Sequence, residues 1–235
     1  FDSGFFSALL LTILWTAVNI ILQLCIAFLV ANLLNSPLIK RQKRVYETIL
    51  MFPWAMPGYV SILLWKTGMF NTQFGLLNTW VQKLGLESRR WLSSDLSAFI
   101  CCTVVNLWLA LPFMIMIMDG GLKSIDKCLY ESATIDGAGK TKQAMVVTIP
   151  CLKPIIWPSV VITTFTTFKT FDVIYLMVLQ TGAQTGAHIH TIITYAYENA
   201  FITNNYGYSS AISIIIFVML IAFSLFTNRR NKDDV

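Results

Sequence analysis

Glu131 and Gly137 mark the ends of the segment whose residue types and spacing are best suited to a specific task. The small residues Ser132 and Ala133 lie between them, and nine further residues separate Gly137 from a Val-x-Ile-Pro sequence that ends at Pro150. Glycine allows a sharp backbone turn after a helix, and proline ends or kinks the helix that follows. No catalytic Ser, His and Asp set and no metal-ligand cluster accompanies the pattern, so we expect it to bind a partner rather than to catalyse a reaction.

A short helix is the element that must position these residues. Ser124 could cap a helix over Lys127–Asp136, which the following glycine would close in the left-handed backbone region. Ile125, Leu129 and Ala133 recur every four residues and would form one apolar stripe. A helix of about ten residues is marginal in water on its own, so this one needs a surface to dock on.

The composition of the chain identifies lipid as its main solvent. Hydrophobic residues make up 56% of the chain, charged residues only 12%, and the mean hydropathy is +0.65. A soluble domain is usually about a quarter charged. A chain of 235 residues cannot hide this much apolar surface in its own core, so we predict an all-α, polytopic membrane protein. The net charge of +5 does not indicate nucleic acid, because the basic residues lie in loops between apolar segments.

Apolar segments long enough to cross a bilayer predict five transmembrane helices. They are Phe5–Leu34, Tyr46–Phe70, Leu96–Met118, a fourth that begins near Pro154 and runs into Lys169 and Asp172, and Tyr208–Thr227. Pro53, Pro57 and Gly58 interrupt the second segment, and Asp119-Gly120-Gly121 should end the third. Proline and glycine are tolerated inside such segments because neighbouring helices or water satisfy the freed backbone groups.

The Lys and Arg residues predict the orientation of the chain. Twelve of the seventeen lie on the side that carries the Glu131–Pro150 loop, so this loop and the carboxyl end should be cytoplasmic. The Asn71–Asp95 loop and the amino end should then be outside. An amino end that starts outside at Phe1 suggests a missing upstream helix, and a cleaved signal peptide is the alternative.

Several motifs resemble the permease subunits of bacterial type I ABC importers. The Glu131–Pro150 sequence reads E-x-A-x-x-x-G-x9-V-x-I-P, which is similar to the cytoplasmic docking loop of these subunits. Further segments resemble the sugar-importing branch, especially the larger permease of maltose/maltodextrin importers. They are Pro53–Pro57, Phe74–Asn78, Asn106–Pro112 and Tyr206–Ile212, and the similarity covers nearly the whole chain in order.

The resemblance implies a transmembrane domain over residues 5–230, with a coupling loop at 122–150 and an extracellular loop at 71–95. The full-length subunit would have six helices and lie in the bacterial inner membrane. Its partners would be a second, homologous permease, two ATP-binding subunits and an extracellular solute-binding protein. ATP and Mg²⁺ would be bound by the partners, so this chain would be a transport subunit with no cofactor and no enzymatic activity. The expected ATPase-coupling residues are Leu129, Glu131, Ser132, Ala133, Asp136, Gly137 and Pro150.

A sugar pathway is also implied by the resemblance. Broken or polar spans are the sequence signal for such a pathway, and a sugar needs hydroxyl or amide partners together with an aromatic face. The alternative for the threonines is a hydrogen bond to their own helix. The expected pathway residues are Trp54, Gly58, Asn106, Leu109, Ala110, Phe113, Thr163, Thr167 and Thr170.

Other functions have weaker support in the sequence. Lys169 and Asp172 could pair on one helix face and serve a proton-coupled secondary transporter, but a simple ion pair is favoured. Gly139-Lys140-Thr141 imitates the end of a phosphate-binding P-loop without its first glycine or a preceding strand, so we reject it. The isolated His188-x-His190 pair lacks a nearby Cys or carboxylate cluster and is not expected to bind a metal. An ABC importer of a non-sugar solute stays open.

Overall fold

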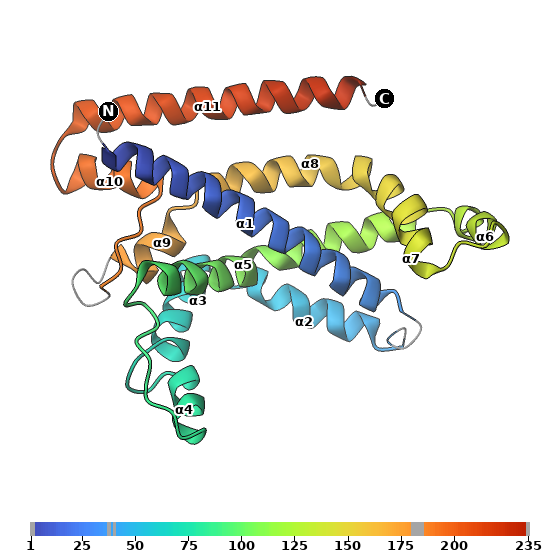
Figure 1. Cartoon of the computed structure of the whole chain (residues 1–235), viewed down its shortest axis with the longest axis horizontal. Helices are drawn as coiled ribbons and strands as arrows, with labels where there is room; N and C mark the ends of the chain where they lie inside the picture. Colours follow the sequence, from blue (N-terminus) through green and yellow to red (C-terminus); the bar gives the residue numbers. More distant parts are fainter. Residues whose placement is uncertain (1–2, 37–38, 40, 180–185, 234–235) are drawn as a thin grey trace. The chain divides into compact units, whose positions relative to one another are not determined.

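The computed structural model describes residues 3–36, 39, 41–179 and 186–233, and within these ranges the chain forms helices and no strand (Figure 1). The all-α prediction is therefore confirmed. Four helical runs are long and apolar enough to cross a membrane. They are α1 (Ser3–Leu34), α5 (Asp95–Ser124), the continuous run of α7 (Lys140–Gln143), η2 (Ala144–Thr148) and α8 (Ile149–Phe168), and α11 (Tyr206–Asp233).

A bent pair of helices is the candidate for a fifth span. α2 (Lys43–Ala55) is followed by α3 (Gly58–Leu64), which continues into the π-helical segment η1 (Trp65–Met69). Pro57 precedes α3 with an extended backbone, which separates the two helices. The count of four spans, or five with this pair, agrees with the five that the sequence predicts. Shorter helices complete the order, namely α4 (Leu76–Lys83), α6 (Lys127–Ile135), α9 (Asp172–Met177) and α10 (Ile192–Phe201).

One predicted helix end is wrong, and at Pro150 one of the two predicted alternatives is excluded. α5 does not stop at Asp119-Gly120-Gly121 but continues to Ser124, because Asp119 finds partners within the protein, described below. Of the end or kink expected at Pro150, the end is excluded, since Pro150 is the second residue of α8 in an unbroken helical run. The wider turn of η2 comes directly before it, and a π-helical turn accommodates a residue that lacks a backbone N–H.

The described chain divides into two compact units. Unit 1 comprises residues 1–19, 56–107 and 164–235, and unit 2 comprises residues 20–55 and 108–163. The helices α1, α5 and α8 contribute residues to both. In unit 1, α10 packs on α11 and α3 packs on α9. Buried Ile192 and Ile212 join α10 to α11, and the backbone N–H of Ile192 donates to Thr12 Oγ1 of α1 at 2.8 Å.

The core of unit 2 is formed by side chains from α1, α5 and α8. Ala27 and Ala31 of α1, Met114 of α5 and Leu152 of α8 are buried together. Gly121 of α5 lies so close to α8 that a Cβ atom at this position would stand 2.7 Å from Leu152 Cδ2. This closeness is typical of membrane helix pairs, in which small residues allow the backbones to approach.

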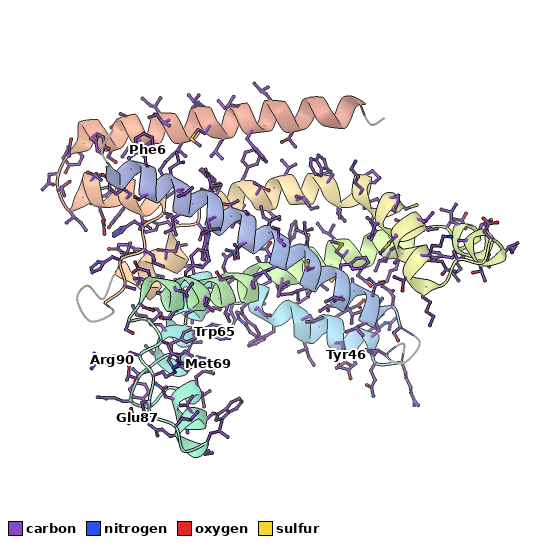
Figure 2. All side chains as sticks on the ribbon, in the orientation of Figure 1. Phe6, Tyr46, Trp65, Met69, Glu87 and Arg90 are labelled. Atoms are coloured by element: carbon purple, nitrogen blue, oxygen red, sulfur yellow. The ribbon has the colours of Figure 1, made fainter. Side chains whose placement is uncertain are left out.

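Large apolar side chains remain exposed on the outer faces of the spans. On α1 Phe6 and Leu10 are 61% and 70% exposed, and on α11 Ile214 and Phe217 are similarly exposed. Figure 2 labels Phe6 near the start of α1, among the side chains that surround the helices. Exposure of so much apolar surface to water is unfavourable, whereas contact with lipid hydrocarbon is not. These faces therefore fit a lipid environment.

An ion cluster within unit 2 holds the end of α5. Asp119 is 3% exposed, and its Oδ1 accepts hydrogen bonds from Asn35 Nδ2 at 2.8 Å and from Lys43 Nζ at 2.7 Å. Its Oδ2 pairs with Lys123, one turn further along α5. Glu47 lies 3.5 Å from Lys123 and 3.9 Å from Lys43. We call Asn35, Lys43, Glu47, Asp119 and Lys123 the Asp119 cluster; it joins the residue after α1, the first turns of α2 and the last turns of α5.

Replacement of Asp119 by leucine should destabilise the protein. It would remove the shared acceptor and leave Lys43 and Asn35 with incomplete partners, at a cost of about 1–3 kcal/mol. Glu47→Gln is the matched control, because its contacts are longer and more exposed, so its effect should stay below about 1 kcal/mol. Thermal unfolding of the purified protein in detergent measures both. Equal melting of Asp119→Leu and the unchanged protein would contradict the role given to the cluster.

The contact at Gly121 gives a second stability test. Gly121→Val should lower the free energy of unfolding by about 1–3 kcal/mol, because its side chain would overlap buried Leu152. Gly120 is the neighbouring control, since a Cβ there meets no atom within 4 Å. Gly120→Val should therefore unfold at nearly the same temperature as the unchanged protein. A similar loss in both variants would mean that valine disturbs the helix itself and not its packing on α8.

Candidate functional site

The loop that follows α5 contains the short helix that the sequence predicts. α6 covers Lys127–Ile135, but its cap is Asp126 and not Ser124. Asp126 Oδ1 accepts the backbone N–H of Cys128 at 3.0 Å, whereas the Ser124 hydroxyl donates to the carbonyl of Gly121 within the last turn of α5. Ser124 still belongs to the preceding helix because α5 runs further than predicted.

Gly137 closes α6 as predicted. Its φ of +75° lies in the left-handed region, and the backbone N–H groups of Gly137 and Ala138 donate to the carbonyls of Thr134 and Ala133 at 3.0 and 2.9 Å. These two bonds form a Schellman motif, which satisfies the carbonyls at the end of the helix and requires a residue that adopts positive φ readily. The chain therefore reverses sharply toward α7.

Side chains fasten α6 to the return segment of the loop. Tyr130 and Thr148 share a hydrogen bond of 3.0 Å between their hydroxyls. Gln143 Nε2 donates to Thr134 Oγ1 and to the Ala138 carbonyl, both at 2.9 Å. α6 contacts both α7 and η2, so the loop is a small folded body rather than an extended connection.

The predicted apolar stripe is only partly correct. Ile125 is buried in the core of unit 2 and Ala133 packs against the edge of that core, but Leu129 is 46% exposed. Tyr130 takes the inward place that Leu129 was expected to hold. Leu129 therefore lies on the outer face of the loop, as does Ile135, which is 87% exposed.

The structure brings six of the seven predicted coupling residues together on α6 and its C-terminal turn. Ala133 is half-buried, and the others are exposed: Leu129, Glu131, Ser132, Asp136 and Gly137. Pro150 is exposed as well, but it lies on α8 rather than on the short helix. The arrangement presents a mixed apolar and polar surface on a body whose opposite side is packed into unit 2.

The predicted pathway residues divide between the two units. In unit 2, Trp54 and Phe113 are exposed, Leu109 and Ala110 are half-buried, and Thr163 is buried. In unit 1, Thr167 is buried, and Gly58 is exposed, so that a Cβ atom there would meet nothing within 4 Å. The Thr170 hydroxyl donates to the Thr166 carbonyl at 3.0 Å. Thr170 thus makes the bond to its own chain that was the alternative for the threonines.

Asn106 has a partner that the sequence did not indicate. Its Nδ2 donates to Asn19 Oδ1 at 2.7 Å, and both side chains are buried in unit 1. Asn19 Nδ2 in turn donates to the carbonyl of Trp15 at 2.9 Å. The sequence analysis did not identify Asn19 or the Asp119 cluster as functional. The signals were an amide within the first apolar segment, at Asn19, and a carboxylate at the end of the third, at Asp119.

The weaker candidates receive little support. Lys169 and Asp172 do not share a helix face, because α8 ends at Phe168 and α9 begins at Asp172. The backbone N–H of His188 donates to Asp95 Oδ1 at 2.7 Å, and His190 Nδ1 lies 3.2 Å from Glu198 Oε2. Across the described ranges, no three or more His, Cys, Asp or Glu side chains are grouped as metal ligands.

Comparison with known proteins finds relatives over most of the chain. The model of the family described as binding-protein-dependent transport system inner membrane component matches residues 23–231. The trehalose/maltose transport system permease protein MalF of Thermococcus litoralis is 31% identical over 94% of this chain and 72% of its own length. The galactooligosaccharides transport system permease protein GanP of Bacillus subtilis is 31% identical over 98% of this chain, which spans 56% of GanP.

A solved structure shares the fold. It is a bacterial ABC transporter involved in the import of the acidic polysaccharide alginate, with a TM-score of 0.86 and 22% identity over 99% of this chain and 80% of that one. The match of the family model to most of the chain, together with these relatives, shows the family. The chain belongs to the inner membrane components of binding-protein-dependent transport systems.

Proposed function

We propose that this chain is the permease subunit of an ATP-binding-cassette importer for a carbohydrate, with a malto-oligosaccharide as the first candidate. Relatives named for trehalose/maltose and for galactooligosaccharides support the carbohydrate class. The observation that carries the proposal is the folded α6 loop. It is closed at Gly137 and packed on unit 2 on one side, while its other side carries exposed apolar and polar residues.

The proposed partners follow from that exposed side. ATP-binding subunits would contact Leu129, Glu131, Ser132 and Asp136 on α6, and these subunits would bind ATP and Mg²⁺ and hydrolyse the nucleotide. A second permease would complete the pathway, and a solute-binding protein would deliver the sugar. Support for the last partner comes from the alginate transporter, which has been solved in complex with an alginate pentasaccharide-bound periplasmic protein.

The orientation of the chain is part of the proposal. The Glu131–Pro150 loop and the carboxyl end would be cytoplasmic, and the Asn71–Asp95 loop would be outside. The excess of Lys and Arg on the side of the α6 loop supports this arrangement. The transmembrane domain would cover residues 5–230, with the coupling loop at 122–150.

The proposed mechanism uses the α6 loop as a rigid body. Movement of an ATP-binding subunit would shift α6, whose hydrogen bonds through Tyr130, Thr134 and Gln143 oppose internal deformation. The Asp119 cluster would pass the shift from the end of α5 to α1 and α2, because it joins all three within unit 2. The spans would then change between inward-open and outward-open states, with the ligand favouring whichever state binds it better.

Asn106 is the residue of the proposed sugar pathway with the best-defined geometry. One N–H of its amide is engaged by Asn19, and an asparagine amide carries a second N–H and an acceptor oxygen that could serve a sugar hydroxyl. Trp54, Gly58, Leu109, Ala110, Phe113, Thr163, Thr167 and Thr170 are the other proposed lining residues.

Coupling through the loop can be tested at two glycines that differ in backbone conformation. Gly137→Val should reduce ATP-driven sugar uptake about tenfold, because a β-branched residue at positive φ costs about 1–2 kcal/mol and opposes closure of α6. Gly139→Val is the matched control, since Gly139 has an extended backbone with φ of −66° and open space around it. Uptake is measured in proteoliposomes that contain the assembled transporter. Equal uptake by both variants would contradict coupling through the α6 turn.

The sugar pathway can be tested on α5. Asn106→Ala should raise the KM for malto-oligosaccharide uptake between about 5-fold and 150-fold, the equivalent of losing a hydrogen bond worth about 1–3 kcal/mol. Thr103→Val is the control one turn earlier, because this buried hydroxyl bonds to its own helix at the Phe99 carbonyl. An unchanged KM in Asn106→Ala would remove this residue from the pathway. Uptake that collapses with the proton gradient, and not with ATP, would instead favour a secondary transporter.

A further inference from the structure

The helix α4 carries an exposed apolar stripe that the proposed transport function does not use. Leu76 and Trp80 of α4 and its C-cap residue Leu84 follow one another at four-residue spacing and are 54%, 64% and 78% exposed. Phe74 precedes the stripe and Leu86 follows it, and both are also largely exposed. A stripe of this kind is the apolar face of an amphipathic helix, and its exposure to water is unfavourable.

Asn78 prevents the stripe from turning inward. Its side chain is fully buried, and its Nδ2 donates to the carbonyls of Asn71, Thr72 and Arg89 at 3.2, 3.2 and 2.9 Å. Its Oδ1 accepts the backbone N–H of Arg89 and the indole N–H of Trp91 at 3.0 and 3.1 Å. Asn78 lies two residues from both Leu76 and Trp80, so it occupies the opposite face of the helix. The hydrogen bonds of Asn78 therefore set the rotation of α4 about its axis and keep the apolar stripe on its exposed face.

The position of α4 in the chain identifies the surface. Six residues, 70–75, separate it from η1 in the broken span, and the next span begins at Asp95. Figure 1 shows that, within unit 1, α4 runs across the direction of α11 and of the start of α5. α4 therefore lies in the connection between the bent pair and α5 and runs across the start of α5, as a helix along the bilayer surface would.

The charged residues beside the stripe indicate which lipid headgroups would bind there. Lys83, Arg89 and Arg90 are exposed around the end of α4, against the single acidic residue Glu87, which gives three positive charges and one negative. Figure 2 labels Glu87 and Arg90 in this loop. Tryptophan and basic residues are typical of helices that lie at the boundary between headgroups and acyl chains.

We propose that α4 is an interfacial helix that inserts Leu76, Trp80 and Leu84 into the bilayer surface, with phospholipid as its occupant. Lys83, Arg89 and Arg90 bind anionic headgroups beside it. The helix thereby holds the 71–94 segment at a fixed depth while the neighbouring spans move. The proposal requires only that the chain spans a membrane, so it is independent of the transported solute and of the ATP-binding partners.

Spin labels on the two faces of α4 test the proposal. The assembled transporter is placed in nanodiscs that contain phosphatidylglycerol, after the exposed Cys25 and Cys128 and the half-buried Cys151 are replaced by serine. A nitroxide at Trp80→Cys or Leu84→Cys should collide more with lipid-soluble oxygen than with a water-soluble nickel chelate. At Gln82→Cys, which is exposed on the opposite face, the order should be reversed.

Other occupants of the stripe give different results. Equal access of the nickel chelate to both faces would show that the stripe faces water, which would overturn the proposal. A label at Trp80→Cys that is immobile and inaccessible to oxygen would indicate a protein contact, and would also overturn it. If this immobility appeared only after addition of the solute-binding protein, that protein would be the occupant.

The headgroup part of the proposal has its own test. The triple variant Lys83→Gln, Arg89→Gln and Arg90→Gln keeps the backbone bonds between Arg89 and Asn78, so the helix should remain in place. In the unchanged loop, phosphatidylglycerol should increase the oxygen-to-nickel ratio at Trp80→Cys relative to phosphatidylcholine alone. The triple variant should lose this increase. An increase of the same size in the triple variant would overturn the assignment of anionic headgroups to these three residues.

Discussion

Polar groups that these spans carry into a bilayer need partners inside the protein, because hydrocarbon offers none. The backbone meets this requirement by forming helices, and several side chains meet it by bonding to the carbonyl four residues earlier, as Thr12 and Thr16 do on α1. Asn19 bonds both to its own helix and to a neighbouring one, since it donates to the Trp15 carbonyl and accepts from Asn106 on α5. The same requirement explains why Asp119 can lie inside a helix end, where three donors surround its carboxylate.

The Asp119 cluster connects this constraint to the functional loop. α5 leads directly into Asp126 and α6, so whatever fixes the end of α5 also fixes the start of the loop. Asp119 fixes it to Asn35 and Lys43. On the far side of the loop, Tyr130 and Ala133 pack on the core that Leu152 and Met114 share. Unit 2 therefore holds the loop at its start and along the inner side of α6, so the exposed residues of α6 have a defined arrangement in this chain alone.

Two surfaces of the chain are built in the same way. On α6, Tyr130 and Ala133 face inward and leave Leu129 and Ile135 outside. On α4, Asn78 faces inward and leaves Trp80 and Leu84 outside. In both helices the internal contacts decide which side is offered to the surroundings. The helices are too short to be stable alone in water, so each depends on its fastened side and on what covers the other.

The sequence by itself determined the membrane class, the four long apolar helices and the loop, because hydropathy and the left-handed turn at Gly137 are local properties of the chain. It could not determine that α5 continues through Asp119, because a carboxylate next to two glycines signals a helix end until its partners are known. Nor could it choose Asp126 over Ser124 as the cap, or place Leu129 outside and Tyr130 inside, since each depends on where other helices pack. Only the tertiary structure supplied Lys43 and Asn35 to Asp119 and Asn19 to Asn106, because these pairs join residues that are 76 to 87 positions apart in the chain.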